Sequence, residues 1–462
     1  MPDIISPIDG QPAYHFDLLG DAEVDERLAL AAATSRAWRD APLDERTALC
    51  RGMLAAYAAR ADENAREITR MMGKPIAQAR GEFERTMVER VEYLCEVAAE
   101  ALADERLPEK QGFRRFIRHE PVGIVLDIAA WNYPLAIAVN VIVPSVLAGN
   151  SVLVKHASQT ALVADQFERA FREAGAPDGL VQAMPMDHET TARLIRSRAL
   201  GYVSFTGSVR GGHEIYRAVA SENFIPAGME LGGKDPALVL ADAEIAFAAE
   251  NLVDGAFYNA GQSCCGIERI YVEDSVFDEF VEAFVALTRQ YTLGDPLEAA
   301  TTLGPLVDAK SADFVRGQVA AAIAAGATRL VGDADFDVPD RSACYLAPQV
   351  LTDVDHSMAL MHEETFGPAI GIARVANESE GVALMNDSDF GLTASIWSGD
   401  LERAGRLAED VEAGTVFANR CDYLDPALAW TGVKDSGRGC TLSRIGYESL
   451  TRPKSFHLRT GI

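Results

Sequence analysis

Two stretches of the chain alternate short apolar runs with helical patterns, and this alternation restricts the fold more than any other feature. In the first stretch, strand-like runs near 122–126, 151–154, 180–184 and 202–206 are separated by helical patterns near 134–148, 160–174 and 188–196. A second set begins after Gly233, with strands near 236–240, 268–273, 346–351, 369–375, 393–398 and 414–418 and helices near 243–258 and 275–290. Such alternation is typical of a parallel sheet with helices on its faces. We therefore expect an α/β protein with two open parallel-sheet domains.

Other segments do not follow this alternation. Residues 21–105 are rich in Ala, Glu, Arg and Leu and poor in helix breakers, so they are predicted to be mostly helical. The segments 113–118 and 453–459 have the pattern of edge strands.

Length and charge limit the classes of function. A chain of 462 residues, 48% of them hydrophobic, is long enough for about two to four domains with large cores. Its formal net charge of −27 argues against nucleic acid and anionic membrane surfaces as partners. The uncharged stretch 128–154 contains Pro134, Asn140 and Pro144, which are costly in hydrocarbon, so a buried strand–helix–strand is expected there instead of a membrane span.

Cysteine usage and the N-terminus indicate a reducing compartment. The seven cysteines show neither a CxxC metal pattern nor a dense disulfide framework, so free thiols and no metal site are expected. The first residues lack the basic and apolar regions of a signal peptide. We expect a cytoplasmic protein.

A thiol and a carboxylate stand in two glycine-flanked motifs. Cys264 lies in Gly261-Gln262-Ser263-Cys264-Cys265-Gly266, and Glu230 lies in Met229-Glu230-Leu231-Gly232-Gly233-Lys234. A lone cysteine is usually an inert core residue and a lone glutamate a solvated charge. Glycines on both sides, however, let the backbone approach a ligand closely. A thiolate that attacks a carbonyl and a carboxylate that activates water are what covalent aldehyde oxidation requires.

These motifs and their interval resemble the active-site signatures of the aldehyde dehydrogenase superfamily. The resemblance extends from Gly73-Lys74-Pro75 to Ser436-Gly437-Arg438-Gly439. It implies a non-acylating, NAD(P)-dependent enzyme close to the small-aldehyde and semialdehyde dehydrogenases. It also implies three parts of the chain: a dinucleotide-binding domain (1–105 and 122–232), a catalytic domain (233–432) and a small β oligomerisation arm (106–121 and 433–462) in a homodimer or homotetramer.

The resemblance assigns three catalytic roles. The Cys264 thiolate attacks a small-molecule aldehyde, and Asn132, in Trp131-Asn132-Tyr133-Pro134, stabilises the oxyanion together with the Cys264 backbone N–H. Hydride transfer leaves a thioester, which water activated by Glu230 hydrolyses to a carboxylic acid. An unperturbed thiol is mostly protonated at neutral pH, so the site must favour the thiolate. Cys265 is expected to be a neighbour only.

A strand-to-helix turn is the first cofactor motif. Phe205-Thr206-Gly207-Ser208-Val209-Arg210-Gly211-Gly212 resembles the variant turn that binds nicotinamide dinucleotides in this superfamily, although a turn with glycines is alone a weak signal. Glu364 and Phe366, in Glu363-Glu364-Thr365-Phe366-Gly367-Pro368, match a second motif. The implied cofactor residues are Trp131, Lys155, Ser158, Thr206, Gly207, Ser208, Gly212, Leu231, Glu364 and Phe366.

Ser158 bears on the choice of cofactor. Many NAD-preferring relatives carry Glu there, where it holds the ribose 2′-hydroxyl. A carboxylate repels a 2′-phosphate and a serine does not. The sequence therefore predicts NAD or NADP as cofactor, with NADP acceptable.

The substrate is less well indicated. The resemblance implies a substrate tunnel lined by Tyr133, Asn140, Ser263, Cys265, Tyr423, Leu424 and Trp430. If the aromatic and aliphatic members line a tunnel, an apolar, aromatic or small aliphatic aldehyde fits best. Succinate-semialdehyde relatives often carry Arg where this chain has Asn140, and a missing cation weakens carboxylate recognition. Chain length favours semialdehydes instead, so this alternative stays open.

Three other functions compete with the leading one. A catalytically silent member of the fold needs none of Cys264, Glu230, Asn132 and Glu364. A cofactor-free thiol hydrolase lacks support from any local Cys–His motif. A CoA-acylating dehydrogenase generally lacks the carboxylate at Glu230.

Overall fold

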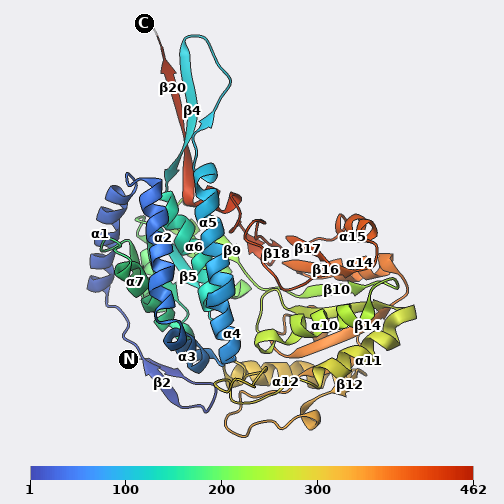
Figure 1. The fold of residues 1–462 in the computed structure, drawn as a ribbon. Coiled ribbons are helices and arrows are strands. Elements are labelled where there is room, and N and C mark those ends of the chain that lie inside the picture. Colours follow the sequence, from blue (N-terminus) through green and yellow to red (C-terminus); the bar gives the residue numbers. More distant parts are fainter. Residues whose placement is uncertain (1, 461–462) are drawn as a thin grey trace.

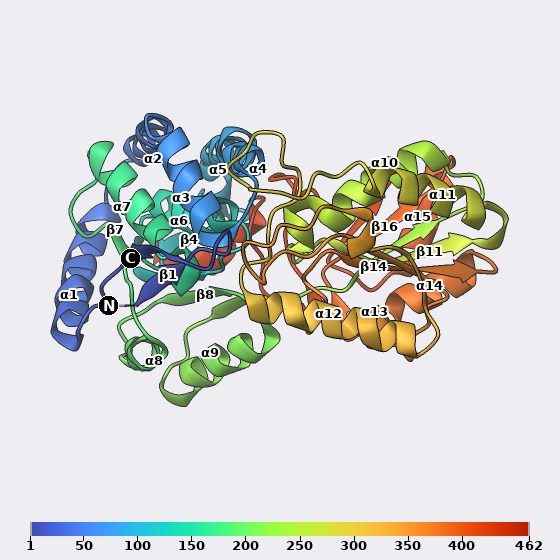
Figure 2. The ribbon, with the colours of Figure 1, turned by 90° about the horizontal axis from the view of Figure 1, so that it is seen from below.

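The structure is a computed structural model that describes residues 2–460. Two α/β domains lie side by side, and a narrow β ribbon projects from the first (Figure 1, Figure 2). The expected fold class is confirmed by the two sheets and by the solved structures compared below.

Helices occupy most of residues 21–101, as the composition predicts. They are α1 (Asp21–Trp38), α2 (Leu43–Ala58), α3 (Ala61–Met72), α4 (Ile76–Gly81) and α5 (Val88–Ala101). A π-helical turn, η1 (Glu82–Met87), joins α4 to α5. Single π turns inside helices are frequent at functional sites, and this one faces the cavity described below.

The first sheet has six strands. Their order is β19 (Gly437–Arg438), β9 (Ala227–Glu230), β8 (Tyr202–Thr206), β5 (Ile124–Ala129), β6 (Ser151–His156) and β7 (Val181–Ala183), and only β19 is antiparallel to its neighbour. The connecting helices are α6 (Pro134–Ala148), α7 (Leu162–Glu173), α8 (His188–Arg196) and α9 (Val209–Glu222).

Both faces of this sheet are buried. Val152 and Val154 of β6 join the core formed with α2, α3 and α5–α7, whereas Leu153 between them joins the core under α1, α8 and α9. Successive side chains of a strand point to opposite faces, so a strand covered on both sides is apolar throughout. The uncharged stretch 128–154 is accordingly β5, α6 and β6, and every residue of α6 is buried. No helix of residues 2–460 has the length and apolar character that crossing a membrane requires.

The second sheet has seven strands. Their order is β12 (Thr328–Val331), β13 (Gln349–Thr352), β14 (Ala369–Val375), β11 (Ile267–Glu273), β10 (Asp235–Val239), β16 (Thr393–Trp397) and β17 (Thr415–Ala418), with β12 antiparallel. Helices α10 (Ile245–Phe257) and α11 (Phe277–Thr288) cover one face. The other face is covered by α12 (Ala309–Ala324), α13 (Ala359–His362), α14 (Glu378–Asn386) and α15 (Leu401–Ala408). Figure 2 shows α12, α13 and α14 on this face.

The projecting ribbon pairs two distant segments. In it β4 (Phe113–Pro121) runs antiparallel to β20 (Thr451–Arg459), and β3 (Glu105–Arg106) adds a short third strand (Figure 1). Phe116 and Phe456 stack across the pair with ring centroids 4.4 Å apart. The nine-residue outer strand β20 has no partner on its other edge within residues 2–460.

Several boundaries differ from the sequence expectations. The oligomerisation arm was expected to include 433–462, but within residues 433–460 only β20 belongs to the ribbon. The short β18 (Val433–Lys434) pairs with β15 (Phe390–Gly391), β19 joins the first sheet, and Tyr447 is buried in the first core. The strand expected near 346–351 begins at Gln349, because Pro348 has no N–H for a ladder. A further pair, β1 (Asp3–Ile5) and β2 (Pro12–His15), was not predicted.

Candidate active site

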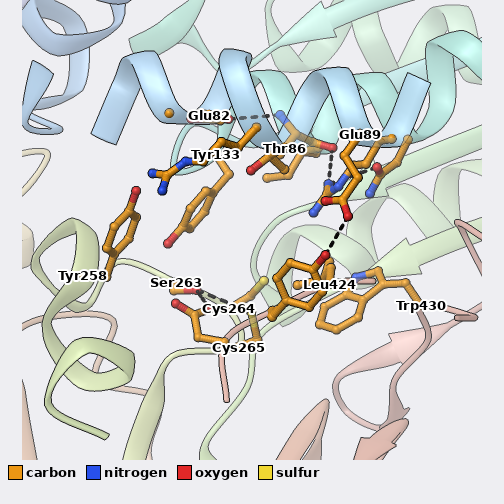
Figure 3. A pocket seen from close by; sticks show the side chains of 18 of the residues that line it. Glu82, Thr86, Glu89, Tyr133, Tyr258, Ser263, Cys264, Cys265, Leu424 and Trp430 are labelled. Atoms are coloured by element: carbon orange, nitrogen blue, oxygen red, sulfur yellow. Dashed lines mark hydrogen bonds between the residues drawn. The ribbon is translucent and has the colours of Figure 1, made fainter. Parts of the chain in front are cut away.

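A cavity of about 420 Å³ lies between the two domains. The first domain contributes η1, α5 and the start of α6, and the second contributes the loops around residues 258–265 and 420–424. Figure 3 shows Glu82, Thr86 and Glu89 on one side of the cavity and Ser263, Cys264 and Cys265 on the other. The wall includes Cys264, Glu230 and Thr206, together with all seven expected tunnel residues: Tyr133, Asn140, Ser263, Cys265, Tyr423, Leu424 and Trp430.

Cys264 is half-buried in a loop that follows α10, and two glycines shape this loop. A Cβ atom on Gly233 would lie 2.2 Å from the Cys264 carbonyl oxygen, and one on Gly261 would lie 2.3 Å from the Gly367 carbonyl oxygen. Gly261 also has a φ of +69°, in the left-handed region. Larger residues at either position would displace the thiol-bearing backbone.

Asn132 lies next to the same loop. It follows β5, is 3% exposed, and its Nδ2 donates to the Gln262 carbonyl at 3.2 Å. Asn259 Nδ2 donates in turn to the Asn132 carbonyl at 3.1 Å. These two bonds hold an uncharged amide donor against the backbone that leads into Cys264.

Glu230 ends β9 and shares the cavity with Cys264. Burial raises the pKa of its carboxyl, whereas the hydrogen bond from Thr441 Oγ1 and the positive charge of Arg90 act in the opposite direction. A carboxylate with a raised pKa is a stronger proton acceptor when it is ionised. The position therefore suits a general base.

The second thiol has a different environment. Cys265 is buried, and its Sγ donates to Asp422 Oδ1 at 3.1 Å. Two main effects raise the pKa of the Cys265 thiol: the larger is its hydrogen bond with Cys264, and the second is its burial. Burial also raises the pKa of Asp422 to about 7. Cys265 is therefore held as a protonated thiol, and Asp422 is a cavity residue that the sequence did not single out.

The first cofactor motif forms the turn between β8 and α9. Ser208 is the N-cap of α9, and its Oγ accepts from Gly211 N at 3.2 Å. Gly207 N donates to the Glu230 carbonyl at 3.0 Å, which joins this turn to the end of β9. Gly212 packs directly under Leu231, because a Cβ there would lie 2.7 Å from a Leu231 methyl. The amides of this helix N-terminus suit an anion.

Lys155 and Ser158 follow at the end of β6. Lys155 is 7% exposed, and its Nζ makes one long hydrogen bond, 3.5 Å to the His156 carbonyl. Burial lowers the pKa of this ammonium group. Ser158 begins the short 3-10 helix Ser158–Thr160. A buried ammonium with so little protein hydrogen bonding is suited to a polar ligand.

The loop 363–368 crosses from the second domain towards the first. Glu364 Oε1 accepts from Gly233 N at 2.9 Å, and burial raises the pKa of Glu364 to about 7. The Phe366 ring packs edge-on against Trp131 of the first domain, with centroids 5.6 Å apart. Of the expected cofactor residues, Glu364 thus lies beside the Glu230–Gly233 segment and Phe366 lies beside Trp131.

Two buried ion pairs support these loops and were not predicted. Lys234 Nζ donates to Glu268 Oε2 at 2.8 Å, and Glu268 also accepts from the backbone N–H groups of Thr365 and Phe366, each at 2.8 Å. Lys74 Nζ donates to Glu82 at 2.6 Å. From the sequence alone, each of these four charged residues would be interpreted as a solvated surface residue. Only the fold shows that they form ion pairs inside the protein.

Glu82 also explains how α6 begins. Its Oε1 accepts from Leu135 N at 2.8 Å and from Ala136 N at 3.0 Å, so it serves as a cap supplied by a different helix. No group of three or more His, Cys, Asp or Glu side chains that could hold a metal ion occurs in residues 2–460.

Comparison with known proteins gives a consistent result. A family profile described as "Aldehyde dehydrogenase family" matches residues 2–456. The chain is 35% identical to 3,6-anhydro-alpha-L-galactose dehydrogenase of Streptomyces coelicolor, with 99% of this chain and 93% of the relative covered. It is also 35% identical to the NAD(P)+ succinate semialdehyde dehydrogenase Sad of Escherichia coli, covering 96% and 94%. The crystal structure of succinic semialdehyde dehydrogenase from Streptococcus pyogenes with NADP+ superposes with a TM-score of 0.94 at 28% identity, covering 99% of each chain.

Proposed function

Because the chain belongs to the aldehyde dehydrogenase family, we propose that it oxidises an aldehyde to a carboxylic acid with NAD or NADP as hydride acceptor. The observation that carries this proposal is the joint placement of Cys264 and Glu230 on the wall of one cavity, with Asn132 held beside the thiol-bearing loop. No single one of these residues would suffice, since each has a structural interpretation by itself.

The residues divide the chemistry between them. The Cys264 thiolate forms a bond to the aldehyde carbon, and the Asn132 amide donates to the oxygen that becomes negative. The bound dinucleotide supplies the acceptor for the hydride that leaves this carbon. Glu230 then takes a proton from water, which attacks the resulting thioester and releases Cys264 and the acid. Over the whole reaction the aldehyde and water lose one hydride and two protons to give the carboxylate.

The residues fit a nicotinamide dinucleotide. Lys155 has a buried ammonium with a single long hydrogen bond, which suits a ribose hydroxyl. The α9 N-terminus beyond Ser208 suits a diphosphate, and Glu364 and Phe366 suit the nicotinamide ribose and ring. Ser158 brings no negative charge that would oppose a 2′-phosphate, so both NAD and NADP are proposed as cofactors.

The names of the relatives do not select one aldehyde. Sad is named for succinate semialdehyde, and the Streptomyces relative is named for an anhydro sugar. The cavity wall carries Arg85, Glu89 and Arg90 besides Leu424 and Trp430. A wall of this composition gives little support to the expectation of an apolar or aromatic aldehyde.

The test measures the formation of reduced nicotinamide by its absorbance. NAD and NADP are each tried with aliphatic, aromatic, sugar and carboxylated aldehydes. Turnover with any aldehyde supports the proposal and ranks the cofactors. Cofactor binding without turnover would favour a silent member of the fold, and a rate that requires CoA would favour the acylating reaction.

A further inference from the structure

Arg90 is a buried cation without an ion pair in the described part of the chain. It lies on α5, is 5% exposed, and forms part of the wall of the cavity that contains Cys264. One terminal nitrogen, Nη1, makes both of its hydrogen bonds, to the Ala136 carbonyl at 2.7 Å and to Asn140 Oδ1 at 3.0 Å. Its Nε has no hydrogen-bond partner.

The nearby acids are engaged elsewhere. Glu82 pairs with Lys74 and caps α6, and Glu89 accepts from Tyr423 OH at 2.7 Å. Glu230 accepts from Thr441 Oγ1. Each of these acids influences Arg90 only through its charge at longer range.

An unpaired charge in this position is costly. Burial lowers the pKa of Arg90, but an arginine stays protonated in proteins, so the guanidinium cannot escape the cost by losing its proton. Removing a charge from water without a partner costs several kcal/mol. When an anion enters the cavity, its charge offsets the cost of burying the guanidinium in the cavity wall.

Asn140 explains how the guanidinium is oriented. The sequence suggested that Asn140 marks the absence of a cation, because related semialdehyde enzymes often carry Arg there. That interpretation was wrong in one respect: the cavity does contain a buried cation, supplied from α5, and Asn140 accepts a hydrogen bond from it. Asn140 is thus a positioning residue for Arg90.

We propose that Arg90 binds the carboxylate of an aldehyde substrate that carries an acid group at the end remote from its carbonyl. The second terminal nitrogen, Nη2, makes no hydrogen bond within residues 2–460, since Nη1 makes both, and it can donate a charge-assisted hydrogen bond to a substrate carboxylate. This inference rests on the proposed function, and it narrows the substrate to semialdehydes.

The experiment compares succinate semialdehyde with its methyl ester, which keeps the aldehyde and removes the charge. The quantity measured is the ratio of kcat/KM for acid over ester, on the pH plateau where Glu230 is ionised in every variant. Wild type is expected to favour the acid. Arg90→Gln is expected to lower the ratio about 30-fold, since a charge-assisted pair is lost.

A second variant keeps Arg90 in place. Asn140→Asp puts a carboxylate of nearly the same shape against the guanidinium, pairs it inside the protein, and is expected to lower the ratio as well. Arg51→Gln is the matched control: Arg51 forms a surface pair with Glu92 of α5, outside the cavity, and this variant should keep the wild-type ratio.

The outcomes separate this inference from the proposed function. Oxidation of acid and ester with equal efficiency by wild type supports the dehydrogenase and overturns the role of Arg90. An equal loss of kcat/KM for acid and ester in Arg90→Gln also overturns the role of Arg90. Such a loss would indicate that Arg90 only holds α5 against α6. Failure to oxidise any aldehyde overturns both proposals.

Discussion

At the scale of single residues, two adjacent cysteines differ in their surroundings. Cys264 is half-buried at the cavity, whereas Cys265 is 4% exposed and hydrogen-bonded to Asp422. A nucleophile must reach its substrate as a thiolate, and a thiol whose pKa is raised by its surroundings does so poorly.

Replacing each cysteine by alanine should therefore have different effects. Cys264→Ala is expected to lower kcat by roughly 1,000-fold or more, because no nucleophile remains. Cys265→Ala should retain most activity. Steady-state rates with a common aldehyde are the measurement, and equal losses in the two variants would contradict the assignment of Cys264.

The role proposed for Glu230 as general base predicts a pH dependence of the reaction. The base acts only when it is ionised, so thioester hydrolysis should rise with pH through the pKa of Glu230, which burial places above the ordinary value of a glutamate. Below that pKa the protonated carboxyl cannot accept a proton from water. The pH profile of kcat should show this rising limb.

Glu230→Gln should remove this rise of kcat with pH. It should also separate the reduction of the cofactor from the hydrolysis of the thioester. We expect a burst of reduced cofactor and then a stall at the thioester, observed by rapid mixing. Full steady-state turnover by this variant would show that another group activates the water.

At the scale of elements, the loop 363–368 depends on one buried carboxylate. Glu268, in β11, receives hydrogen bonds from two successive backbone N–H groups of this loop and from Lys234. A loop that places Glu364 and Phe366 is thereby fixed to a strand of the second sheet.

Glu268→Gln should loosen this arrangement. Lys234 would remain buried without its anion, which costs about 3–5 kcal/mol of unfolding free energy. Denaturant unfolding measures this cost, and NAD(P) binding should weaken in parallel. The control is Asp274→Asn, which breaks the exposed pair with Arg374 and should change neither quantity much. A fully stable Glu268→Gln variant with normal cofactor affinity would contradict the role of this pair.

At the scale of the whole molecule, the projecting ribbon remains to be explained. The outer strand β20 is long, and its free edge offers unpaired backbone groups in the described chain (Figure 1). Such an edge is a ready template for pairing with another chain. We propose that this ribbon is the oligomerisation arm expected from the sequence.

Sedimentation should accordingly find a homodimer or homotetramer. Exchanging Phe456 and Leu458 for lysine on β20 should shift the equilibrium towards monomer, because Leu458 is 45% exposed and the added charges would repel a second copy. A wild-type monomer at micromolar concentration, or an unchanged assembly in the variant, would contradict this role.

The sequence predicted the parts of the molecule that depend on local pattern. Apolar runs such as 151–154 indicated buried parallel strands because both faces of such strands exclude water, and β6 is found there. The helical range 21–105 was predicted from its composition and its lack of helix breakers, and the segments of the ribbon from their edge-strand pattern. Motifs with flanking glycines also identified Cys264 and Glu230, and the resemblance to aldehyde dehydrogenases supplied the seven expected tunnel residues. The fold brings all of them to one cavity.

Other features depend on contacts between distant residues, which no local pattern contains. Glu82 caps a helix that begins at Pro134, Glu268 holds a loop near residue 365, and Arg90 on α5 meets Asn140 on α6. In the sequence each of these charges resembles a solvated side chain. The sequence by itself thus determined the fold class and the candidate reactive residues, whereas only the tertiary structure decided which charges are buried at the cavity that these residues line. The reason is that burial and pairing arise only when separate elements pack together.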